Sequence, residues 1–203
     1  SVTRKEANHF VTNFSYGNNE LPKIKGLNFN EKNAFIAIPN VKRDTISYWL
    51  RDSSLVNQDT LRMEINYLKT DSLGKLVVQN DTMEVLSKQP YEKRMNTAKK
   101  EFEKWQKVQE KAKKKGDPYQ AVKPQENIKL NVNAPTELDP DKNIPIGVDA
   151  PLEKVDTSKI HLYTKIDTLW YKAKYAFRPL AHRDANGKLV RSDTLKYGMD
   201  YEL

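Results

Sequence analysis

Histidine, cysteine and carboxylate side chains are the residues most able to hold a metal or move a proton, and here they are sparse or scattered. The three histidines lie far apart, at His9, His161 and His182, without the His-Glu-x-x-His spacing of a helical zinc site. The chain has no cysteine, which excludes thiolate ligands, cysteine nucleophiles and disulfides. We therefore expect neither a metal site nor a cofactor.

Loops that cradle phosphates or present a nucleophile are also missing. No Walker loop, Gly-x-Gly-x-x-Gly or Gly-x-Ser-x-Gly motif occurs among the seven glycines. The stretch Asp184-Ala185-Asn186-Gly187 opens like a calcium loop, but no acidic residue follows at the position that would complete the cage. The same residues suit a hairpin turn, which we favour. The sequence thus predicts a protein that is not an enzyme.

Two tryptophans are the best candidates for binding. In a strand, successive side chains point to opposite faces. Trp49 would lie opposite its apolar neighbours Tyr48 and Leu50, and Trp170 opposite Leu169 and Tyr171. An exposed indole could stack on a sugar or contact another protein. The alternative, which we favour, is that a helix covers one or both rings.

The elements that would position these side chains are short strands. Asp-Thr followed by alternating apolar and polar residues recurs at Asp44, Asp59, Asp81, Asp167 and Asp193. Asp favours a turn, Thr favours an extended backbone, and the alternation buries one face. We expect strands near 8–16, 33–38, 45–50, 60–68, 74–79, 82–87, 127–133, 144–148, 158–164, 168–177 and 188–197. This spacing is typical of β-sandwiches.

One segment has helical periodicity instead. Between Tyr91 and Lys115, ten basic residues and four glutamates give +6 of the net charge of +8. Apolar residues three or four apart, among them Met95, Phe102 and Trp105, predict an amphipathic helix that Gly116 ends. We expect a spacer whose Met95, Phe102 and Trp105 pack on a sheet. Attachment to nucleic acid or an anionic membrane is the disfavoured alternative.

The predicted organisation is mainly β: two immunoglobulin-like antiparallel β-sandwich domains joined by one long charged α-helix. Residues 1–90 form the first domain, 91–116 the helix, and 117–203 a second domain truncated at its C-terminus. Similar turn-strand segments at Asp71–Val77 and Asp184–Val190 suggest one β-module on either side of the helix. Since the chain starts at Ser1 without an initiator Met, we expect a fragment of a longer protein.

Several stretches resemble a known family. The segment from Ile144 to Tyr163, with its Pro-Leu, Val-Asp and Lys-Ile pairs, resembles bacterial Ig-like domains of the S-layer type. Leu21–Phe29, Tyr48–Asp52, Asn57–Glu64 and Lys165–Tyr171 look like the Ig-like domain-containing lipoproteins of Bacteroidetes. The resemblance implies an internal part of an exported protein of the cell envelope, whose lipid anchor lies upstream of Ser1.

These observations favour a non-catalytic structural or adhesive segment that positions or contacts a protein partner at the cell surface. The alternative is a carbohydrate-binding module that uses Trp49 and Trp170. Nucleic acid is not an expected partner, and a membrane is expected only through the upstream anchor. The identity of the partner and the oligomeric state do not follow from the sequence.

Overall fold

The computed structural model describes residues 1–124, 128–132, 134–135, 137–139, 142–152, 155–179 and 200–202. The chain divides into two compact units, Ser1–Glu126 and Asn127–Leu203. The described residues are mainly β, arranged in several sheets together with two α-helices. None of their helices is long and apolar enough to cross a membrane.

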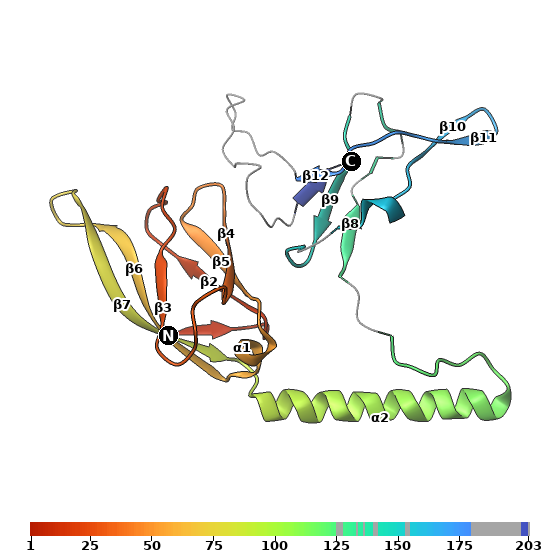
Figure 1. The fold of residues 1–203 in the computed structure, drawn as a ribbon, viewed down its shortest axis with the longest axis horizontal. Coiled ribbons are helices and arrows are strands. Elements are labelled where there is room, and N and C mark those ends of the chain that lie inside the picture. The colour runs from red at the N-terminus through yellow and green to blue at the C-terminus, as the bar shows by residue number, and fades with distance from the viewer. Residues whose placement is uncertain are drawn as a thin grey trace. The chain divides into compact units, whose positions relative to one another are not determined.

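The first unit contains seven strands in two sheets (Figure 1). The elements are β1 (Val2–Arg4), β2 (His9–Asn13), β3 (Lys23–Gly26), β4 (Phe35–Pro39), β5 (Thr45–Leu50), α1 (Ser53–Asn57), β6 (Thr60–Thr70), β7 (Leu76–Ser87) and α2 (Tyr91–Lys115). One sheet has the order β1-β7-β6-β3, in which β1 runs parallel to β7 and the other pairs are antiparallel. The other sheet has the antiparallel order β2-β5-β4.

A single hydrophobic core lies between these two sheets. The sheet of β6 and β7 contributes Leu61, Met63 and Val85, all fully buried, and the sheet of β2 and β5 contributes Phe10 and Tyr48. The ring of Phe10 stacks on Tyr48, with centroids 5.1 Å apart. The predicted alternation in β6 is therefore confirmed for Leu61 and Met63, because every second residue faces the core.

Strand β7 differs from the sequence-based expectation. Residues 74–79 and 82–87 do not form two strands, since β7 runs unbroken from Leu76 to Ser87. Asp81 lies within this strand because its carboxylate accepts hydrogen bonds from Tyr67 and Gln79 instead of closing a turn. The two-stranded end of β6 and β7 then extends beyond β1 and β3 as a hairpin.

The second unit contains β8 (Leu130–Val132), β9 (Pro145–Val148), a 3-10 helix at Thr157–Lys159, β10 (Tyr163–Ile166), β11 (Leu169–Lys172), β12 (Arg178–Pro179) and β13 (Asp200–Glu202). One sheet has the order β12-β13-β9-β8, and β10 and β11 form a separate hairpin. Val148 on β9 is buried, whereas every residue of β10 and β11 is exposed. The strand expected near 188–197 lies outside the described residues.

Candidate functional site

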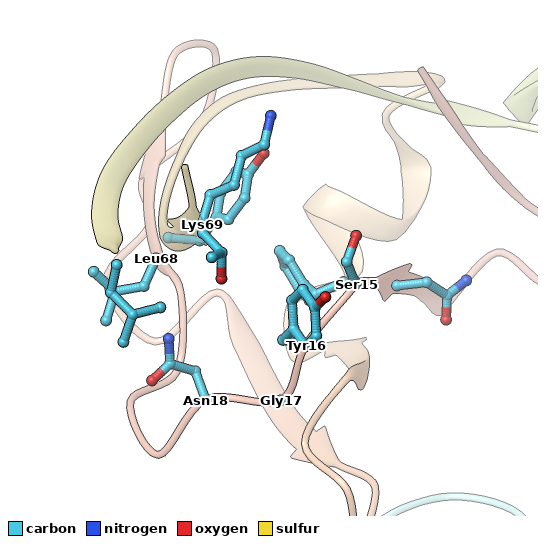
Figure 2. A pocket seen from close by; sticks show the side chains of 11 residues that line it. Ser15, Tyr16, Gly17, Asn18, Leu68 and Lys69 are labelled. Atoms are coloured by element: carbon cyan, nitrogen blue, oxygen red, sulfur yellow. The ribbon is translucent and has the colours of Figure 1, made fainter. Parts of the chain in front are cut away.

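A pocket of about 310 Å³ lies where the loop after β2 meets the projecting end of β6 and β7. We call it the Tyr16 pocket. Residues 13–18 line one side, and residues 67–70 with Leu76 line the other. Figure 2 shows Tyr16 and Asn18 on the loop, across the pocket from Leu68 and Lys69. The pocket therefore joins two segments that are about fifty residues apart in the sequence.

The loop side is held by the turn between β4 and β5. The N–H of Phe14 donates to the carbonyl of Asp44 at 2.7 Å, and the guanidinium of Arg43 donates to the carbonyl of Asn19. Gly17 packs so closely that a Cβ on it would lie 1.7 Å from the carbonyl oxygen of Lys42. Only glycine allows this approach, so backbone contacts fix the loop that carries Tyr16.

The hairpin side is held by Tyr67. Its hydroxyl donates to Asp81 Oδ2 at 2.7 Å, and Gln79 Nε2 donates to Asp81 Oδ1 at 2.8 Å. Both hydrogen bonds lower the pKa of the Asp81 carboxyl below its ordinary value, and the bond from Tyr67 has the larger effect. The ring of Tyr67 also lies 5.2 Å, centroid to centroid, from Phe14. This ring contact connects the two sides of the pocket.

Trp49 is covered, as the favoured alternative expected, but by a neighbouring strand and not by a helix. It is 8% exposed, so this candidate contact has no free face for a sugar or a partner. Its ring stacks on His9, the cross-strand neighbour on β2, with centroids 4.4 Å apart and planes 15° apart. Ile36 is its neighbour on β4. Side chains on both sides of β5 therefore enclose the indole.

Trp170, by contrast, is 66% exposed on the β10–β11 hairpin. Its cross-strand neighbour is Lys165, whose Nζ lies 5.9 Å from the centroid of the indole ring. Asp167, with φ of 56°, forms the turn together with Thr168. Tyr163 shares the face of Trp170, whereas Ile166, Leu169 and Tyr171 lie on the opposite face. Large apolar side chains are thus exposed on both faces of one hairpin.

Helix α2 buries none of its residues. The expected packing of Met95, Phe102 and Trp105 on a sheet is not observed in the described part of the chain, because Met95 is 50% and Phe102 42% exposed. Phe102 and Trp105 instead stack on each other, with centroids 5.8 Å apart. They line a groove of about 580 Å³ between α2 and residues 119–123. The N–H of Gln120 donates to Gln109 Oε1 at 2.8 Å and holds this segment against the helix.

The histidines of the described residues have local partners. His9 Nδ1 lies 3.3 Å from Glu6 Oε2, and the ring of His161 lies 6.4 Å from that of Tyr163. Among the described residues, no group of three or more His, Asp or Glu could hold a metal ion. His182, the Asp184–Gly187 motif and the repeat at Asp193 lie outside them.

Comparison with known proteins adds no relative. No family model, no curated protein and no solved structure matches the chain. The function is therefore argued below from the geometry of the described residues.

Proposed function

We propose that this chain is a non-catalytic structural or adhesive segment of an exported bacterial surface lipoprotein, which contacts a protein partner in the cell envelope. In this proposal the two compact units are Ig-like β-sandwiches and α2 is the spacer between them. The lipid anchor belongs to a part of the protein upstream of Ser1. The resemblance of Leu21–Phe29 and Lys165–Tyr171 to Ig-like lipoproteins supports the envelope assignment.

The perturbed carboxyl groups support a non-catalytic role, since each one stabilises local structure. Four carboxyl groups have a pKa below the ordinary value, and in each the leading cause is a hydrogen bond from a nearby residue. The donors are Asn40 for Asp44, Ser54 for Asp52, Tyr67 for Asp81 and Ser158 for Asp156. Asp52 and Asp156 accept from backbone N–H groups at the start of α1 and of the 3-10 helix. Carboxylates used in this way act as caps and turn anchors.

The observation that carries the proposed contact is the β10–β11 hairpin. Its exposed fractions are 58% for Ile166, 60% for Leu169, 66% for Trp170 and 48% for Tyr171. A two-stranded hairpin is marginally stable by itself in water, and clustered exposed apolar side chains mark interaction sites. Tryptophan and tyrosine are also the residues that most often dominate binding energy at protein interfaces. The hairpin therefore suits a partner with an apolar cleft.

A photo-crosslinking experiment in the producing bacterium tests this contact. A photoreactive amino acid replaces Thr168, in the turn beside Trp170, in the full-length protein. We expect a protein adduct of one defined mass, which the double substitution Trp170→Ala with Tyr171→Ala removes. The matched control carries the photoreactive group at Lys107, on the exposed surface of α2. Equal adducts from both positions, or none from Thr168, would contradict the proposal.

Carbohydrate binding at Trp170 is the second candidate, and the exposed indole beside Lys165 favours it. Binding of an oligosaccharide that Trp170→Ala abolishes, while the fold is unchanged, would support this candidate. An enzymatic activity that one polar substitution removes would contradict both functions. A broad hydrolase assay of the purified chain provides that measurement.

A further inference from the structure

We propose that the Tyr16 pocket binds a pyranose ring of a saccharide. This inference is independent of the hairpin contact proposed above, because the pocket belongs to the first unit and shares no residue with β10 or β11. Its volume of about 310 Å³ lies at the lower end of the range of small-ligand pockets, roughly 300–1,000 Å³. That size suits one sugar unit of a chain whose remaining units extend into solvent.

The aromatic residues provide the surfaces that a sugar ring requires. Tyr16 is 72% exposed on a loop whose other residues are mainly polar. Phe14 and Tyr67, with ring centroids 5.2 Å apart, form the inner wall. A pyranose presents C–H groups on its faces and hydroxyls at its rim, and tyrosine combines an apolar ring with a polar tip. The aromatic side chains therefore match the faces of the sugar.

The polar lining matches the hydroxyl rim. Asn13, Ser15, Asn18 and Thr70 line the pocket, and their amide and hydroxyl groups can each donate and accept hydrogen bonds. Sugar hydroxyls need both kinds of partner. A pocket with only apolar walls would bind a lipid or another apolar ligand instead, so this mixture of groups favours a saccharide.

The charge of the lining residues favours a neutral or an acidic sugar. Lys69 is the only charged residue among those that line the pocket, and no carboxylate lines it. After the hydrogen bonds from Tyr67 and Gln79, the positive charge of Lys69 is a smaller cause that lowers the pKa of the Asp81 carboxyl. The lining therefore accepts a neutral sugar or one that carries a carboxylate, and it offers nothing to a cation.

The pocket is held in place without a ligand. Gly17 and Phe14 fix the loop against the turn between β4 and β5, and the hydrogen bond between Tyr67 and Asp81 fixes the hairpin. A preformed site loses less conformational entropy when a ligand binds. None of these contacts involves the exposed side chain of Tyr16. A substitution of Tyr16 should therefore weaken binding without disturbing the fold of the pocket.

The proposal is tested by binding of the purified chain to immobilised maltotriose, cellotriose and trigalacturonate. Calorimetry then measures the affinity for each sugar that binds. We expect Tyr16→Ala to weaken binding by about tenfold, since a stacked ring contributes up to about 1.4 kcal/mol and that energy is tenfold in affinity. Asn18→Ala should weaken the same interaction. Leu73→Ala is the matched control, because Leu73 is 80% exposed at the hairpin tip and does not line the pocket.

The role of Lys69 distinguishes the two sugar classes. If trigalacturonate binds, Lys69→Ala should weaken it and added salt should have the same effect. If a neutral trisaccharide binds, Lys69→Ala should leave the affinity within about twofold. Binding that survives Tyr16→Ala but is lost in Trp170→Ala would overturn the pocket assignment and place the saccharide on the hairpin. Failure to bind any of the three sugars would also overturn it and leave the crosslinking test unaffected.

Discussion

Asp59 Oδ1 accepts a hydrogen bond from the backbone N–H of Tyr91 at 2.7 Å, and this contact joins α2 to the β-sheets of the first unit. Pro90 precedes the helix and provides no side-chain cap, so the carboxylate of Asp59 takes that role from a position distant in sequence. The carbonyl of Asp59 also accepts from the N–H of Ser87 at 2.7 Å. The first turn of α2 is thereby fixed to the start of β6 and the end of β7.

Replacement of Asp59 by Ala should loosen the start of α2. We expect the free energy of unfolding to fall by about 1 kcal/mol, the usual loss for a helix N-cap. Faster amide hydrogen exchange at Tyr91 and in the first turn of the helix would localise the effect. Asp59→Asn keeps a side-chain oxygen at the same position and should retain most of the stability. Equal losses in the two variants would contradict a capping role.

The charged group buried most deeply in the first unit is the guanidinium of Arg4, which is 1% exposed. It donates to the carbonyls of Ala7 at 3.0 Å and Leu55 at 3.3 Å, and also to that of Gln58. Burial, followed by the charge of Arg94, lowers the pKa of Arg4 below its ordinary value. Arg4 therefore satisfies carbonyls at and beyond the C-terminal end of α1.

Arg4→Met should destabilise the protein by about 2–3 kcal/mol, because buried carbonyls lose a charged donor. Chemical denaturation followed by circular dichroism measures the change. Arg62→Met is the matched control, since Arg62 pairs with Glu84 at 2.9 Å on the surface and its side chain is 62% exposed. That substitution should change the stability by less than about 0.5 kcal/mol. Similar losses of stability in the two variants would contradict the conclusion that the buried hydrogen bonds of Arg4 stabilise the fold.

Local patterns predicted local structure well. The alternation of Leu61 and Met63 gave the buried face of β6, and Gly116, with φ of 78°, ends α2 at the predicted position. In both cases the residues that decide the structure lie within the element or directly beside it. The short strands β1 and β3 were missed, because each has only three or four residues and is defined by pairing with a distant strand.

Side-chain placement that depends on distant residues was not predicted. Alternation put Trp49 on an outer face, where we expected a helix to cover it, but His9 covers its ring from another strand. The Tyr16 pocket was missed for the same reason, because residues 13–18 and 67–70 come together only in the folded sheet arrangement. Gly17 was the available signal, since a glycine in a polar segment between strands can mark a close backbone approach.

Gly17→Ala should be much more disruptive than an ordinary surface substitution. The new Cβ would lie 1.7 Å from the carbonyl oxygen of Lys42, so the loop or the β4–β5 turn must move. We expect a loss of about 1–3 kcal/mol, typical of overpacking, together with changed amide chemical shifts from Phe14 to Asn19. Gly147→Ala is the control, because the nearest atoms to its Cβ would be 3.9 Å away. A Gly17→Ala variant as stable as the Gly147→Ala variant would contradict the close approach.

Tyr48 should make the protein sensitive to alkaline pH. Burial raises the pKa of Tyr48 to about 12, from an ordinary value of 10.0, because the core disfavours the phenolate. Below about pH 10 this hydroxyl is neutral in both the folded and the unfolded chain, and its contribution to stability is complete. As the pH rises from about 10 to about 12, the unfolded chain ionises first and the folded state loses that contribution. Tyr48→Phe should therefore show a smaller fall in the free energy of unfolding over this interval.

Denaturant titrations measure this difference at a series of pH values between about 9 and 12. Tyrosinate absorbance is recorded in parallel. Tyr16→Phe is the matched control, because it removes the same hydroxyl from a tyrosine that is 72% exposed, whereas Tyr48 is 2% exposed. In the folded wild-type chain, the late part of the tyrosinate absorbance should include Tyr48, and Tyr48→Phe should remove that part. If Tyr48→Phe and wild type lose the same free energy of unfolding above pH 10.0, ionisation of Tyr48 does not cause the loss of stability at alkaline pH.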